Sequence, residues 1–139
     1  MERDPSDLPG MRRNPWRLTT SDGKTDFTAF RDTTLLPPAL VVRAGDRELR
    51  YHLRCLDDLY EMLKERGGWV PLGSAEENED VVSGSVEEWA RSAQNPLGGW
   101  YGLKKGFRGG FAAFVPPVMK TLNLAEVEGS PRDGRMRAV

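Results

Sequence analysis

The first third of the chain alternates short apolar stretches with turn residues. Residues 16–20 and 25–31 are rich in threonine and aromatic side chains and flank an Asp22-Gly23 pair, which suits the tight turn of a β-hairpin. Residues 39–42 form an apolar run, and residues 48–53 alternate polar with apolar side chains as a half-buried strand does. The pattern therefore predicts two consecutive β-hairpins.

A helical spacing replaces this alternation after residue 55. Leu56, Leu59 and Leu63 recur on one face and predict a helix over residues 56–66, and the glycines at 67 and 68 end it. Residues 69–72 then favour one more short strand.

The second half predicts short helices followed by a hairpin. Ser85 and Glu88 form a capping box that starts a short helix. Residues 111–122 carry an apolar stripe at helical spacing, but Pro116 and Pro117 interrupt it, so we expect two short helices that meet at the prolines. Residues 125–128 and 135–139 predict a terminal β-hairpin.

These elements predict an α+β protein, with N-terminal antiparallel hairpins packed by one helix and a C-terminal winged-helix-like lobe of short helices and a hairpin. Residues 1–14 lack an apolar period, which indicates a disordered leader. We expect residues 15–139 to form a single compact domain, with sublobes 15–73 and 85–139 joined by an acidic loop, 74–84. Five aromatic residues are predicted to join the sublobes: Trp69, Trp89, Trp100, Phe111 and Phe114.

Charge is sorted along the chain, although the net charge is only −1. Residues 74–88 contain six acidic and no basic side chains, whereas residues 95–139 contain seven basic and three acidic ones. Such asymmetry bears on partners rather than on fold.

The chain has few residues suited to catalysis or to metal binding. His52 and Cys55 are its single histidine and single cysteine, whereas a structural zinc site needs about four ligands and nucleophilic catalysis needs an oriented base. We therefore expect no metal, no cofactor and no catalytic residue. One cysteine, no secretory signal and a longest apolar run of nine residues predict a cytoplasmic location away from membranes.

Residues 95–110 are the most unusual stretch, with six glycines among sixteen residues. Lys104, Lys105 and Arg108 would attract phosphate, and three aromatic side chains could stack on bases or line a groove: Trp100, Tyr101 and Phe107. In the alternative interpretation, the glycines form tight turns, the aromatic side chains pack in the core and the lysines are solvated.

Two resemblances accompany these patterns. Residues 122–128 and the turn Ser130-Pro131-Arg132-Asp133-Gly134-Arg135 resemble the end of the recognition helix and the wing of MarR-type winged-helix regulators. The resemblance implies that Arg132 and Arg135 contact the DNA minor groove. Residues 53–59, 69–74 and 98–108 also resemble a family of short, uncharacterised bacterial proteins.

The function expected first is nucleic-acid binding or regulation through a basic C-terminal face. Its residues are Lys104, Lys105, Arg108, Lys120, Arg132, Arg135 and Arg137. The alternative is a non-catalytic protein-interaction or assembly module, in which the acidic loop and the basic face pair with an acidic protein, another partner or a second copy of the chain. One continuous basic patch would favour nucleic acid, and neutralisation by the acidic loop would favour the interaction module.

Overall fold

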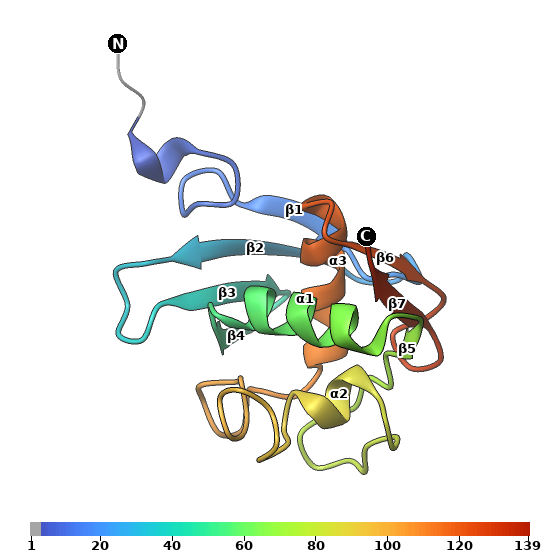
Figure 1. The fold of residues 1–139 in the computed structure, drawn as a ribbon. Coiled ribbons are helices and arrows are strands. Elements are labelled where there is room, and N and C mark those ends of the chain that lie inside the picture. Colours follow the sequence, from blue (N-terminus) through green and yellow to red (C-terminus); the bar gives the residue numbers. More distant parts are fainter. Residues whose placement is uncertain (1–3) are drawn as a thin grey trace.

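The computed structural model describes residues 4–139, and its N-terminal half is a four-stranded antiparallel sheet (Figure 1). The strands follow one another in the order β1-β2-β3-β4. Their bounds are β1 (Trp16–Thr19), β2 (Asp26–Asp32), β3 (Ala39–Ala44) and β4 (Arg47–His52). Both predicted hairpins are confirmed, and the short turns between strands explain the meander order.

Helix α1 (Cys55–Arg66) leads from this sheet to a second, three-stranded sheet. The helix ends at Gly67, which adopts a left-handed conformation and donates its N–H to the carbonyl of Leu63. The second sheet has the order β5-β7-β6, with strands β5 (Val70–Pro71), β6 (Ala125–Glu128) and β7 (Arg135–Ala138). The terminal hairpin is thus confirmed, and β5 joins it from far along the chain.

Helix α2 (Val86–Trp89) is the predicted short helix, and the Ser85 side chain accepts the Glu88 N–H. Helix α3 (Phe111–Thr121) differs from the prediction, because it is one continuous helix that contains both Pro116 and Pro117. The two prolines remove two backbone donors, but both rings are buried and add to an almost wholly apolar helix. Burial of this helix therefore outweighs the local cost that led us to predict a break.

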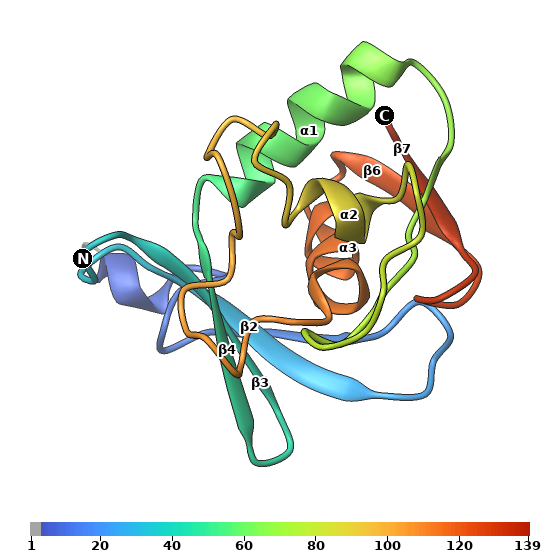
Figure 2. The same cartoon turned by 90° about the horizontal axis from the view of Figure 1, so that it is seen from below.

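Helix α3 lies in the middle of the molecule, between the four-stranded sheet, α1 and the C-terminal hairpin (Figure 2). One core cluster takes in residues of both sheets and all three α-helices, so the expected sublobes share a single core. The α+β class is confirmed. Among residues 4–139, every helix is too short or too polar to cross a membrane.

The predicted disordered leader is wrong for residues 4–14, which pack along β2 after a 3-10 turn at Pro5–Asp7. Arg31 donates its N–H to the carbonyl of Gly10 at 2.8 Å, and Arg12 forms an ion pair with Asp32 at 2.8 Å. Tertiary contacts thus order this segment, and such contacts leave no periodic pattern of apolar residues in the sequence. The first three residues of the predicted leader lie outside the described residues.

Candidate functional site

The seven residues of the expected basic face fall into separate groups. Lys104, Lys105 and Arg108 lie in the loop that follows a short antiparallel pairing of Leu103 with Arg50 at the outer edge of β4. The three C-terminal arginines lie in the hairpin β6–β7, on the other side of the molecule in both views (Figures 1 and 2). The cations therefore do not form one continuous patch.

The acidic loop lies against several of these cations and neutralises part of their charge. Arginines from three other segments reach it: Arg47 to Glu76 at 3.3 Å, Arg108 to Glu77 at 3.0 Å and Arg132 to the Ser74 carbonyl at 3.1 Å. The loop is thus fixed by contacts within the chain.

A buried ion pair fixes the same loop from inside. The Glu87 side chain is 1 % exposed and accepts the Ala112 N–H at 3.0 Å, so it caps α3 in place of the side chain that Gly110 lacks. Arg91 lies 3.2 Å from Glu87 and also donates to carbonyl groups of the acidic loop. Burial raises the pKa of the Glu87 carboxyl. This pair joins α2, α3 and the loop.

The hairpin arginines are also paired. Arg135 lies 2.5 Å from Glu128 and Arg137 lies 2.9 Å from Glu126, the residues directly opposite them across the hairpin. Both guanidinium groups also stack on the ring of Trp69, at 4.2 and 4.4 Å from its centre. Trp69 is therefore part of a surface stack and not part of the aromatic core predicted from the sequence.

Helix α3 offers little surface to a ligand, because eight of its eleven residues are buried. Lys120 and Thr121, at its C-terminal end, are exposed. A helix that reads the DNA major groove presents several polar side chains at its surface, and α3 does not.

The three aromatic residues of the glycine-rich segment have three different environments. Tyr101 is fully buried and donates its hydroxyl to Asp58 at 2.7 Å, which agrees with the alternative interpretation that the aromatic side chains pack in the core. Trp100 lies beneath the guanidinium groups of Arg91 and Arg108. Phe107 is 43 % exposed.

A groove beside this segment is the feature that sequence reasoning missed. It lies between the β2–β3 loop and residues 103–104, has a volume of about 500 Å³, and is lined by Leu35, Leu36, Pro37, Glu48, Arg50, Leu103 and Lys104. Leu36 is 96 % exposed. The Leu35-Leu36-Pro37-Pro38 run was the available signal, because two leucines before two prolines suit an apolar loop better than a strand.

The floor of the groove is apolar and its rim is positively charged. Phe30, Ala39 and Val41 are buried on this outer face of the sheet, and Leu35 and Leu103 pack against them. At the rim, hydrogen bonds from Arg43 and Arg50 lower the pKa of Glu48, so one carboxylate is shared by two arginines. Within residues 4–139, Lys104 and Lys105 have no acidic partner. We call these lining residues the Leu36 groove; Lys105 follows Lys104 in the same loop, and Phe107 lies against Lys104.

His52 and Cys55 do not form a reactive pair. Cys55 is buried, and burial raises the pKa of its thiol, so it is not a thiolate near neutral pH. Burial, with Arg54 nearby, lowers the pKa of His52. In the part of the chain that the structure describes, no group of three or more histidine, cysteine or carboxylate side chains is placed to hold a metal ion.

Comparison with known proteins gives one result. No curated protein and no solved structure matches this chain. A family model described as a family of unknown function (DUF6855) matches residues 9–139, and the chain belongs to this family.

Proposed function

We propose that this protein is a non-catalytic interaction module that binds an acidic, apolar segment of another protein in the Leu36 groove. The observation that carries the proposal is the 96 % exposure of Leu36 beside an apolar floor. A large apolar side chain held in water next to other apolar groups is typical of a binding surface.

The expected partner follows from the charge of the rim. Lys104 and Lys105 have no acidic partner among the described residues, and Glu48 balances only one of its two arginines. An acidic segment would gain from these cations, whereas a basic one would be repelled. The cations mainly guide and orient the partner, and Leu36 supplies most of the affinity.

The size of the Leu36 contribution follows from its area. Full burial of a leucine side chain stabilises a complex by about 1.5 to 3 kcal/mol. This corresponds to a change in Kd of roughly tenfold to a hundredfold. Loss of the Leu36 side chain is therefore expected to weaken binding by about this factor.

A peptide-display selection tests the proposal while the partner itself is unidentified. Random 12-residue peptides are selected on the wild-type protein and then measured on Leu36→Asp, on Lys104→Glu and on Val82→Asp, an exposed control in the acidic loop. We expect enriched peptides that combine acidic and apolar residues. Their affinity should fall at least tenfold on Leu36→Asp, by a smaller factor on Lys104→Glu, and not on the control. Enrichment of basic peptides, or binding that does not depend on Leu36, would contradict the proposal.

Nucleic-acid binding is a second candidate, supported by the order of elements. The succession α1-β5-α2-α3-β6-β7 with the sheet order β5-β7-β6 is similar to that of winged-helix domains. Exposed Lys120 and the hairpin residue Arg132 would contact phosphates, in keeping with the MarR-type resemblance. The buried surface of α3 and the pairing of Arg135 and Arg137 favour the interaction module instead.

Titration with labelled duplex DNA at two salt concentrations tests this second candidate. Phosphate contacts release counterions, so binding that is real weakens steeply as salt rises. We would expect Lys120→Glu to weaken it further. No binding at low salt would exclude this candidate.

A further inference from the structure

A row of polar side chains crosses the outer face of the four-stranded sheet beside the Leu36 groove, and its Arg43 contacts Glu48 of that groove. The strand register places Arg17 of β1 opposite Thr28 of β2, and Thr28 opposite Arg43 of β3. Because neighbouring strands lie about 4.8 Å apart, the Cα atoms of the two arginines are about 10 Å apart. In this register, Thr28 thus lies between the two arginines.

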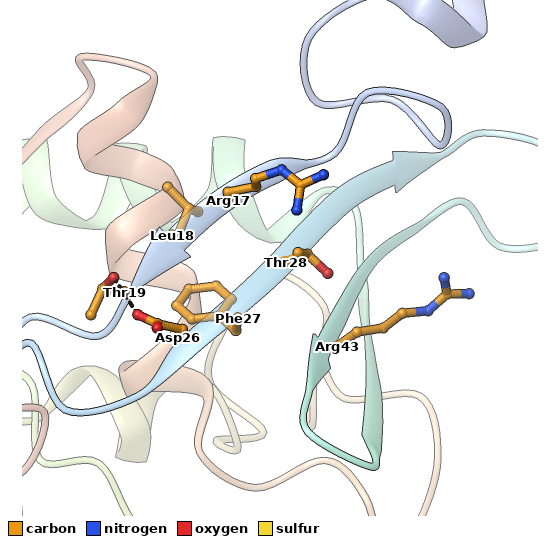
Figure 3. Close-up of a pocket in the computed structure, with 7 residues that line it drawn as sticks. All are labelled: Arg17, Leu18, Thr19, Asp26, Phe27, Thr28 and Arg43. Atoms are coloured by element: carbon orange, nitrogen blue, oxygen red, sulfur yellow. Dashed lines mark hydrogen bonds between the residues drawn. The ribbon is translucent and has the colours of Figure 1, made fainter.

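These three residues line a depression of about 420 Å³ (Figure 3). In Figure 3, the Arg17 side chain lies over β2 close to Thr28, whereas the Arg43 side chain extends from β3 toward solvent. The depression therefore has one arginine close to Thr28 and a second at its edge.

Arg17 is distinctive because it has no partner. Among the arginine side chains of residues 4–139, its guanidinium alone makes no hydrogen bond, ion pair or ring contact. The Thr28 hydroxyl, too, has no hydrogen-bond partner within this range. Both groups are available to donate to a ligand.

Arg43 is held in place and still has free donors. Its Nε donates to Glu48 at 2.9 Å, and its guanidinium carbon lies 5.2 Å from the centre of the Phe30 ring. Neither contact uses both terminal nitrogens of the Arg43 guanidinium, so it can still donate to a ligand. Asp26 is the one acidic residue among those that line the depression, and it accepts the Thr19 hydroxyl at 2.9 Å, so one of its oxygens is already occupied.

We propose that Arg17, Thr28 and Arg43 form a binding site for a phosphate dianion, free or as a monoester. Donors on three strands suit an anion whose acceptor oxygens point in several directions. The tetrahedral oxygens of phosphate do so, whereas the two oxygens of a carboxylate lie in one plane. Arginine forks also match phosphate oxygens in geometry and charge.

The test is a pair of titrations of isotope-labelled protein at pH 7.5 and constant ionic strength, with inorganic phosphate and with acetate, followed by amide and arginine side-chain NMR signals. We expect phosphate to shift the signals of Arg17, Thr28 and Arg43 together and to saturate, while the signals of exposed Arg13 stay unchanged. O-phosphoserine is titrated as a further ligand. If it binds more tightly than inorganic phosphate, the site takes a phosphate monoester; if inorganic phosphate binds more tightly, the site takes free phosphate.

Variants assign the effect to these side chains. Arg17→Gln is expected to weaken phosphate binding by about tenfold, because a charge-assisted contact is lost. Arg13→Gln, which removes the same charge elsewhere, is the control and should leave binding unchanged. Shifts that do not saturate, equal shifts at Arg13, or acetate binding as tight as phosphate binding would overturn the proposal.

Discussion

Replacement of Arg91 by glutamine tests the buried ion pair that joins α2, α3 and the acidic loop. The Arg91 side chain is 11 % exposed and lies 3.2 Å from the fully buried Glu87. Removal of one partner of a buried pair costs about 3 to 5 kcal/mol, because the remaining charge has no compensation. In this variant Glu87 still accepts hydrogen bonds from the backbone N–H groups of Ala75 and Ala112. Because these bonds partly compensate its charge, we expect the lower end of this range, a loss of about 3 kcal/mol from the free energy of unfolding at pH 7.

The loss should depend on pH, because burial already raises the pKa of Glu87 and removal of Arg91 raises it further. A carboxyl whose pKa is higher in the folded state stabilises the fold below its unfolded pKa, and this stability is lost as pH rises through the folded pKa. The deficit of Arg91→Gln should therefore shrink between pH 7 and pH 5.

Urea unfolding followed by tryptophan fluorescence measures this free energy. The double variant Glu87→Gln/Arg91→Gln is the matched control, and it should be more stable at pH 7 than Arg91→Gln because it contains no unpaired buried charge. A deficit below about 1 kcal/mol, or one that is equal at both pH values, would refute this account of the pair.

Three further predictions concern other contacts. Hydrogen bonds from Thr34 and Arg12 lower the pKa of Asp32 from 3.8 to about 2. The stability that Asp32 contributes is therefore present above pH 4 and lost as pH falls through about 2. Across this range, the urea midpoint of Asp32→Asn should fall less than that of the wild-type protein. Tyr101→Phe removes the 2.7 Å hydrogen bond to Asp58, and thermal unfolding should show a loss of about 1.5 kcal/mol. Gly109→Ala places a Cβ against the backbone of Glu76 and Glu77 in the acidic loop and should destabilise the fold by about 1 to 3 kcal/mol in urea, whereas Gly99→Ala meets open space and should have little effect.

Much of the fold followed from local patterns in the sequence. Both N-terminal hairpins, helix α1 and the terminal hairpin appeared where alternation, turn residues and capping glycines indicated them. The continuous α3 and the ordered segment 4–14 did not, because both depend on burial and tertiary contacts that a local pattern does not encode. The pairing of β5 with β7 joins residues more than sixty positions apart and has no local signal either.

The candidate sites were harder to predict than the fold. The sequence correctly showed where the charge is concentrated, but not that Arg108 pairs with Glu77 or that Arg135 pairs with Glu128. The role of Arg17 depends on strand register, which places it beside residues of two other strands. The two leucines before two prolines indicate an apolar loop, but the exposure of Leu36 depends on the path of that loop, which the sequence pattern does not encode.

Site-specific photo-crosslinking at position 36 tests the central claim, that the Leu36 groove binds an acidic, apolar protein segment. A photoreactive amino acid is introduced at position 36, with position 82 as the control, and crosslinked peptides are identified by mass spectrometry with and without Lys104→Glu. We predict a crosslink from position 36 to a segment rich in acidic and apolar residues, which Lys104→Glu weakens and which position 82 does not give. Crosslinks to basic segments, or equal crosslinks from both positions, would contradict the claim.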